Sequence, residues 1–174
     1  MLFKVQFAGI TLYYAKTVTG DIMQLKIETI KKKATVFFPE NTQLDGYFFV
    51  SAIAAFHEGG ELITELLAKD RNYIPFETQQ GEIVLLRKEN MMMVSLEEEE
   101  VDNFLPGYKQ VTVVIHLLTG KSFLGKVSFA LPETHSRLSD FLNSRDAFFR
   151  MEIDGKNYLI QNRFVKMISA EKTG

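Results

Sequence analysis

The chain has 174 residues, of which 46% are hydrophobic and 24% charged, and its net charge is −2. This composition is ordinary for a globular protein of one medium or two small domains, and it excludes a disordered or collagen-like chain. The absence of cysteine excludes disulfides, thiolate metal sites and a cysteine nucleophile. It also fits a reducing compartment. We find neither a signal-peptide pattern nor an apolar run of the roughly 18 residues that span a membrane, so we expect a cytoplasmic protein without a membrane partner.

Residues 1–30 are predicted to form an N-terminal β-hairpin extension. Apolar and polar side chains alternate in residues 3–7, 10–14 and 22–27, and glycines interrupt these runs. A hairpin of this kind needs the edge of a sheet to join. We therefore expect it to complete a sheet, to bridge two units or to pair with another chain.

Residues 31–100 are predicted to form a first unit with the order β-β-α-β-β-β. Short runs rich in β-branched and aromatic residues, separated by turn-forming residues, predict its strands. The five strands are expected at residues 34–38, 44–50, 71–77, 82–86 and 90–96. Between the second and third strands, residues 62–68 place apolar side chains at i, i+3 and i+4, which is one face of a short helix.

Residues 108–174 are predicted to form a second unit with the same order of elements. Residues 100–108, which begin with the last of four consecutive glutamates (97–100) and contain a Pro-Gly turn signal, separate the two units. The second helix is expected at residues 136–143. The strands of this unit are expected at residues 111–115, 123–129, 146–152, 157–160 and 164–170.

The two units match in the character of their residues. Segments 63–67 and 138–142 have the same helical pattern, and each second strand contains a glycine. The offset between the copies falls from 79 to 75 to 74 residues along the chain, which small loop insertions explain. The sequence therefore predicts an internal duplication in a mainly β protein with minor α content, built as two tandem small barrel-like units. A two-layer sheet with a covering helix is the alternative.

The second helix has the sequence Ser-Arg-Leu-Ser-Asp-Phe-Leu-Asn at residues 136–143. With the strands around it, this stretch resembles an uncharacterised bacterial family of small β-barrel-like domains, in which a hairpin leads into an RLSDFLN-type helix and then into further strands. The resemblance covers about residues 109–171. It implies a fold and brings no established activity. The first unit departs from it, because Ala68 stands in the place of Asn143.

Arg137, Asp140 and Asn143 lie at i, i+3 and i+6 of the second helix, where Arg137 and Asp140 can pair on its surface. A structural role for these three residues is the first interpretation, and contact with a ligand is the alternative. Arg145 and Arg163 are further candidates for an interaction, because they belong to the more basic half of the chain.

Charge is distributed unevenly along the chain. Residues 31–100 carry seven basic and 13 acidic side chains, whereas residues 101–174 carry ten basic and seven acidic ones. Opposite charges on the two halves favour contact between the halves or between chains. Drift between two copies of one unit is the alternative explanation.

Other patterns predict structure rather than chemistry. His57, His116 and His135 lack the spacing of metal ligands, and no set of nucleophile, base and orienting group assembles. Residues 120–122 (Gly-Lys-Ser) end like a phosphate loop but join two strands, so we expect a hairpin turn there. The methionines at 91–93 are expected to fill the core, and exposure of one or two of them is the alternative, because neighbours on a strand face opposite sides. We expect no enzyme activity, no cofactor and no metal.

The leading hypothesis is a non-enzymatic, cytoplasmic protein-interaction or regulatory scaffold module that binds other proteins or forms a homo-oligomer. The first alternative is single-stranded nucleic-acid binding through the second unit, whose basic residues lie near aromatic ones. The second alternative is a small-ligand sensor that uses a groove between the two units.

Overall fold

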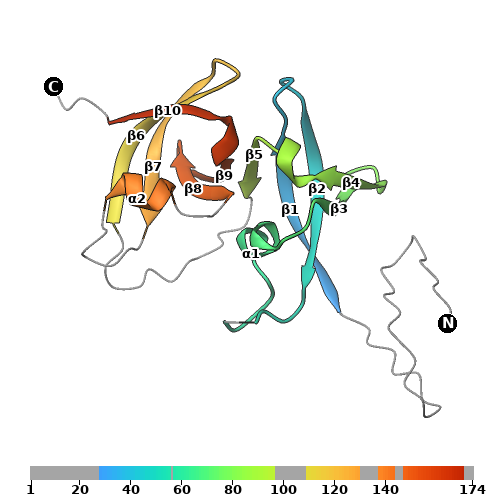
Figure 1. Ribbon diagram of the computed structural model, residues 1–174. Coiled ribbons are helices and arrows are strands. Elements are labelled where there is room, and N and C mark those ends of the chain that lie inside the picture. Colours follow the sequence, from blue (N-terminus) through green and yellow to red (C-terminus); the bar gives the residue numbers. More distant parts are fainter. Residues whose placement is uncertain (1–27, 56, 97–108, 130–136, 144–146, 171–174) are drawn as a thin grey trace, which may run out of the picture.

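The computed structural model describes residues 28–55, 57–96, 109–129, 137–143 and 147–170. Within these residues the chain forms ten strands, two short helices and two 3-10 turns, and the ten strands belong to one antiparallel sheet (Figure 1). The predicted mainly β character is confirmed. Residues 1–27 and 97–108, which include nearly all of the predicted N-terminal hairpin and linker, lie outside the described residues.

Strands β1 to β5 form the first half of the sheet. They are β1 (Thr29–Phe37), β2 (Gln43–Ser51), β3 (Tyr73–Thr78), β4 (Ile83–Arg87) and β5 (Met93–Leu96). Helix α1 (Ile63–Ala68) connects β2 to β3, and the 3-10 turn η1 (Lys88–Asn90) lies between β4 and β5. Strands β1 to β4 are neighbours in chain order, and β5 returns to pair with β1.

Strands β6 to β10 form the second half. They are β6 (Lys109–Leu117), β7 (Ser122–Phe129), β8 (Phe148–Ile153), β9 (Lys156–Gln161) and β10 (Val165–Ala170). Helix α2 (Leu138–Leu142) precedes β8, and the 3-10 turn η3 (Asn162–Phe164) lies between β9 and β10. Strands β6 to β9 are again neighbours in chain order, and β10 returns to pair with β6.

The two halves share their strand order and their register. Ala34 on β1 faces Gly46 on β2, and the matching pair in the second half is Val113 on β6 and Gly125 on β7. The ladder between β1 and β5 corresponds in the same way to that between β6 and β10. The ladders β2–β3 and β3–β4 correspond to β7–β8 and β8–β9. The likeness seen in the sequence thus extends to which residues face one another.

Two matching glycines let the second and third strands of each half approach closely. A Cβ atom added at Gly46 would overlap the carbonyl oxygen of Glu77, and one added at Gly125 would overlap that of Glu152. A glycine inside a strand commonly marks such a close approach of another backbone. The glycine therefore has the same structural role in both halves.

Each half has its own hydrophobic core, and the cores exchange residues where the halves meet. Leu159 on β9 belongs to the core of the first half, whereas Met92 and Met93 belong to the core of the second. Met91, Met92 and Met93 are all buried. The prediction that they fill the core is confirmed, and the alternative that one or two are exposed is wrong, because β5 lies between β1 and β9 in the middle of the sheet.

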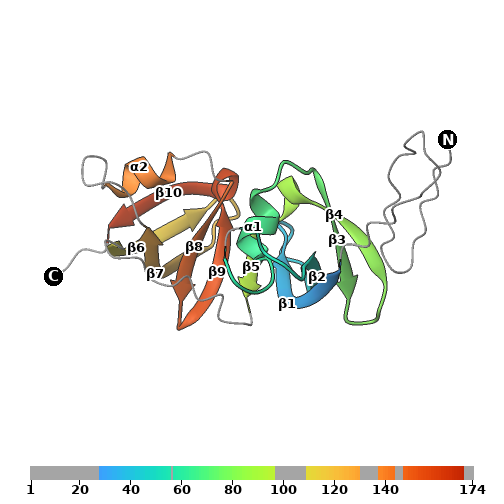
Figure 2. The same ribbon diagram turned by 90° about the horizontal axis from the view of Figure 1, so that it is seen from below.

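The sheet is open. Its described strands run from β6 and β10 at one end to β3 and β4 at the other, with β9 beside β5 in the middle (Figure 2). The predicted closure of each unit into its own barrel is not found among these strands, because β9 pairs with a strand of the other half. The halves therefore form one continuous sheet through the β5–β9 ladder.

Candidate functional site

The β5–β9 ladder is the junction between the halves. In its antiparallel register Met93 faces Ile160, and Val94 faces Leu159. The side chain of Leu159 is 1% exposed and that of Met93 is 4% exposed. Pairing of the two strands thus completes a backbone ladder and removes apolar side chains from water, which is the main favourable term in association.

Polar contacts surround this junction. The side-chain amide of Gln161 is buried, and in the orientation that satisfies its hydrogen bonds it donates to the carbonyl oxygens of Met91 (2.7 Å) and Glu89 (3.1 Å). The guanidinium of Arg163 on η3 lies 3.5 Å from the Glu89 carboxylate on η1. At the hairpin tips, the Lys121 ammonium donates to the side-chain oxygen of Asn41. These contacts fix the position of one half on the other.

Strands β4 and β10 are the two ends of the described sheet, and each pairs with a neighbour on one side only. Leu85 occupies on β4 the place of Leu159 on β9, and Met167 occupies on β10 the place of Met93 on β5. Leu85 and Met167 are each 53% exposed. The end strands therefore present to solvent the apolar side chains that the junction buries.

The two end strands differ in how they are protected. Free edges of natural sheets commonly carry charges, prolines or bulges that prevent pairing with another chain. Strand β10 has a register shift between Val165 and Met167 and an exposed Lys166, which protect only its first residues, because its ladder with β6 is regular from Met167 to Ala170. Strand β4 carries no charged side chain over residues 83–86. Its edge is consequently open to a further strand.

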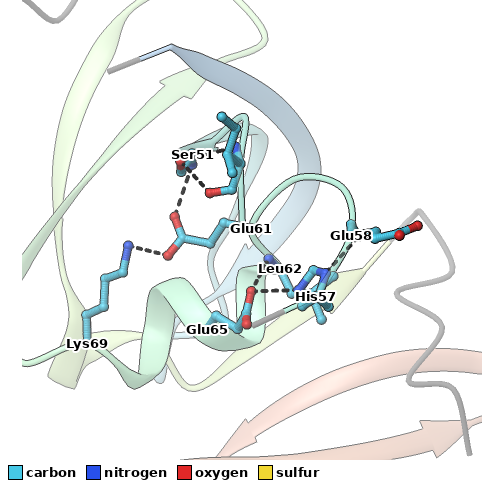
Figure 3. Close-up of polar contacts among 8 residues, drawn as sticks. Ser51, His57, Glu58, Glu61, Leu62, Glu65 and Lys69 are labelled. Carbon is cyan, nitrogen blue, oxygen red and sulfur yellow. Dashed lines mark hydrogen bonds and ion pairs between the residues drawn. The ribbon is translucent and has the colours of Figure 1, made fainter. Parts of the chain in front are cut away.

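A cluster of charged side chains surrounds α1 (Figure 3). The buried Glu61 carboxylate accepts a hydrogen bond from the Ser51 N–H at 3.0 Å and pairs with the Lys69 ammonium. Glu65 accepts a hydrogen bond from the Leu62 N–H at 2.8 Å and so caps the first turn of the helix. The cluster connects the end of β2 to both ends of α1.

His57 joins this cluster through both of its ring nitrogens. Nδ1 lies 2.9 Å from the Glu58 carbonyl oxygen, and Nε2 lies 3.1 Å from the Glu65 carboxylate. Both oxygens are acceptors, so a doubly protonated ring satisfies both contacts. The Glu58 carbonyl and then Glu65 raise the pKa of His57 above 6.5. Burial raises the pKa of Glu65, but hydrogen bonds from Leu62 and His57 outweigh it and lower that pKa below 4.5.

The predicted interaction residues do not form one site. Arg137 immediately precedes α2, Asp140 lies in its first turn, and the Asn143 side chain donates to the Ser139 carbonyl oxygen at 2.8 Å. Arg145 lies outside the described residues. Arg163 lies at the junction between the halves. It contacts Glu89 there, and its guanidinium lies 5.3 Å from the centre of the Phe164 ring.

The remaining motifs are found in structural positions. Gly120 has a φ of 84° in the tight turn between β6 and β7, which confirms the predicted hairpin. His116 on β6 contacts the Ser122 hydroxyl at 2.7 Å. His135 lies outside the described residues. Among the described residues, no group of three or more His, Cys, Asp and Glu side chains is placed to hold a metal ion.

Some basic side chains of the second half lie opposite or beside polar and acidic residues. Lys126 faces Glu152 across the β7–β8 ladder, and the Arg150 guanidinium donates to the Asn157 side chain at 3.2 Å. Part of the positive charge therefore lies next to polar or acidic residues of the sheet. Nucleic-acid binding through this half stays a prediction, as does ligand binding between the halves.

Sequence reasoning did not single out Leu85, Met167 or Glu89. Their importance depends on which strands end the sheet, and strand order is not visible in local propensity. One signal was present, because the apolar run at residues 83–86 lacks any charged residue. Such a run is unusual for an exposed edge strand.

Comparison with known proteins finds no matching family model, no matching curated protein and no matching solved structure. The resemblance of residues 109–171 to a bacterial domain family therefore stays a prediction. Neither helix in the described part of the chain is long and apolar enough to cross a membrane.

Proposed function

We propose that the protein is a non-enzymatic interaction or scaffold module that binds partner proteins by strand addition at the free edges of its sheet. The observation that carries the proposal is the open end of the sheet at β4, which has no charged side chain over residues 83–86 and presents Leu85 to solvent at 53% exposure. Strand addition supplies affinity through backbone hydrogen bonds and specificity through alternate side chains.

The junction between the halves supports this proposal. It is itself an example of strand addition, because β9 of one half extends the sheet of the other beside β5. We infer that each five-stranded half is one copy of a duplicated, barrel-like module. On this inference the module pairs through its outer strands, while the second and third strands and the helix hold its core.

The titratable groups around α1 fit a supporting role in this proposal. Glu61 and Glu65 accept hydrogen bonds from backbone N–H groups, and His57 and Lys69 pair with these carboxylates. These contacts hold the loop that joins β2 to α1 in place. On this proposal the edge strands, and not this cluster, bind partner proteins.

A photo-crosslinking experiment tests the proposal. A benzophenone amino acid replaces Leu85 in the full chain, and the matched control replaces Leu124, which is 50% exposed on the interior strand β7. After irradiation in an extract of the source cells, we expect a protein adduct from position 85 and little from position 124. Mass spectrometry then identifies the crosslinked segment.

Two results would contradict the proposal. Equal adducts from positions 85 and 124 would mean that the edge strand has no special affinity for proteins. Adducts with nucleic acid, together with salt-sensitive co-purification of material absorbing at 260 nm, would favour the basic second half as the functional surface.

A further inference from the structure

We propose that the strand which pairs with β4 is β10 of a second copy of this chain, in the register of the internal β5–β9 junction. The inference rests on the proposed function, because it names the partner of the same edge. It predicts a head-to-tail assembly in which each contact between chains repeats the contact between halves.

The strand order carries this inference. The described sheet has the order β10-β6-β7-β8-β9 followed by β5-β1-β2-β3-β4. Each half therefore begins with its fifth strand and ends with its fourth, and the fourth strand of one half pairs with the fifth of the other. The two edges of the described sheet are again a fourth strand, β4, and a fifth strand, β10. A fourth strand and a fifth strand pair at the junction, so each edge could pair with the other edge of a second copy.

The internal junction dictates the register between chains. Met93 faces Ile160 and Val94 faces Leu159 inside the chain. The matching residues between chains are four pairs, with the β10 residue first. They are Met167 with Leu86, Ile168 with Leu85, Ser169 with Val84, and Ala170 with Ile83. A shift by one residue would turn every side chain to the opposite face of the sheet, so this register is specific.

The exposed side chains fit this pairing. Leu85 and Met167 are each 53% exposed, whereas their counterparts Leu159 and Met93 are 1% and 4% exposed at the junction. Pairing of β4 with β10 would remove both side chains from water in the way that the junction does. An exposed apolar strand edge is otherwise a site of uncontrolled association.

The charges at the junction remain complementary between chains. Inside the chain, Glu89 on η1 pairs with Arg163 on η3, and these two residues hold matching positions in the halves. In the proposed contact, Arg163 of one copy takes the place of Glu89, and Glu89 of the next copy takes the place of Arg163. Opposite charges therefore meet again with their order reversed, and each side chain would be shared between the partner in its own chain and the partner in the next copy.

One junction contact has no counterpart between chains. Lys121 and Asn41 bridge the halves, but the matching residues are Thr42 and Gly120. The linker between the halves also keeps β5 and β9 at a high effective concentration, which separate chains lack. We therefore expect the assembly to be weaker than the junction and to depend on protein concentration. A head-to-tail contact of this kind closes into a ring or continues as a filament.

The first test measures mass by light scattering coupled to size exclusion over a range of concentrations. We expect the wild-type mass to rise from 19.9 kDa toward multiples of that value. Leu85→Lys blocks β4 and Met167→Lys blocks β10, and each variant alone is expected to lose association by about tenfold or more in dissociation constant. Leu124→Lys, which changes an equally apolar exposed residue off the edges, is the matched control and should associate like the wild type.

Mixing the two blocked variants makes the test specific for the head-to-tail contact. The Leu85→Lys chain keeps an intact β10, and the Met167→Lys chain keeps an intact β4, so an equimolar mixture should form a one-to-one dimer. If β4 instead paired with β4, the Met167→Lys variant would associate alone. If β10 paired with β10, the Leu85→Lys variant would associate alone. Either of these results overturns the inference. Thermal unfolding of each variant confirms that it folds.

Engineered cysteines test the register, since the chain has no native cysteine. A chain with Ser169→Cys and a second chain with Val84→Cys should form a disulfide across the proposed ladder. The pair Ser169→Cys and Leu85→Cys is displaced by one residue and should crosslink far less, because successive side chains point to opposite faces.

The outcomes separate this inference from the proposed function. If position 85 captures a different protein, or residues 1–27 of its own chain, while the wild type stays monomeric, the inference is wrong. Capture of a different protein would still support the proposed function as an interaction module. A monomer that captures nothing at position 85 would overturn both.

Discussion

Strands β9 and β4 hold the same place in the two halves but have different neighbours. Leu159 on β9 is buried against β5, whereas Leu85 on β4 is half exposed. The residue type is the same and the ladder to the preceding strand has the same register. The difference therefore comes from the presence or absence of a further strand, which shows that burial here depends on assembly of the sheet rather than on local sequence.

Truncation of these two leucines should give the largest difference in stability between the two strands. We expect Leu159→Ala to lower the free energy of unfolding by about 2–5 kcal/mol, because it leaves a cavity in a shared core. Leu85→Ala should change it by less than about 0.5–1 kcal/mol when measured on the monomer. Urea unfolding at low protein concentration measures both. Equal costs for the two substitutions would contradict the assignment of β4 as a free edge.

The matching glycines offer a second comparison, in which the halves should behave alike. Gly46→Ala and Gly125→Ala each place a Cβ atom against a backbone carbonyl of the neighbouring strand. We expect each to cost about 1–3 kcal/mol of unfolding free energy, because the strands must move apart. Denaturant unfolding of the two variants side by side measures this. A large loss of unfolding free energy in one half and none in the other would mean that the two halves pack differently at these glycines although their register is the same.

The sequence predicts the elements of both halves well and their arrangement less well. Runs of β-branched residues identify the strands, and the shared glycines at 46 and 125 align the halves, because these signals are local. The place of β5 in the middle of the sheet depends on its ladder with β9, about 65 residues further along the chain. For that reason the packing of Met93 in the core of the other half and the exposure of Leu85 could not be predicted from local pattern.

The same limit applies to the candidate site. Residues on α2 were prominent because they carry charge at helical spacing, yet Asn143 contacts the backbone of its own helix. Arg163 was selected for its charge, and the structure shows that its neighbour is Glu89 of the other half. A charge pattern indicates that a residue has an electrostatic role, and only the packing of the halves identifies its partner.

The two helices also occupy matching places and differ in burial. Helix α1 buries Ile63, Leu66 and Leu67, whereas α2 has no fully buried residue. The third helical residue is Glu65 in α1 and Asp140 in α2, and Glu65 reaches the Leu62 N–H. The shorter Asp140 side chain has one methylene less with which to make that contact.

Substitution of these two acids should sharpen the comparison of the helices. We expect Glu65→Ala to cost about 0.5–2 kcal/mol, which is the usual range for loss of a helix cap. Asp140→Ala should cost less, at most about a few tenths of a kcal/mol. Asp140→Glu should stabilise the second half slightly. Hydrogen exchange at the two helices distinguishes local from global loss. A larger loss of stability at Asp140 than at Glu65 would contradict the assignment of Glu65 as the stronger helix cap.

The smallest expected effect is a dependence of stability on pH. It should come from the loop before α1, where His57 and Glu65 lie. The Glu58 carbonyl and Glu65 raise the pKa of His57 above 6.5 in the folded state. The protonated ring is thus favoured by folding, so His57 contributes stability below 6.5 and loses it as pH rises through its folded pKa. The pKa of Glu65 is lowered below 4.5, so its contribution is present above 4.5 and is lost as pH falls through its folded pKa. The pair therefore stabilises the loop most at pH values between about 4.5 and 6.5.

An NMR titration of the histidine rings measures this directly. The midpoint of His57 should lie above 6.5, and Glu65→Gln should move it toward 6.5 without reaching it, because the Glu58 carbonyl is the larger cause of the shift. Glu82→Gln, which changes a carboxylate in the β3–β4 turn outside this cluster, should leave the midpoint unchanged. A midpoint at or below 6.5 in the wild type, or one that ignores Glu65→Gln, would show that the ring does not hold the loop to the helix. In that case the capping of α1 by Glu65 would act alone, and the first helix would owe its order to the buried face that the second half helps to cover.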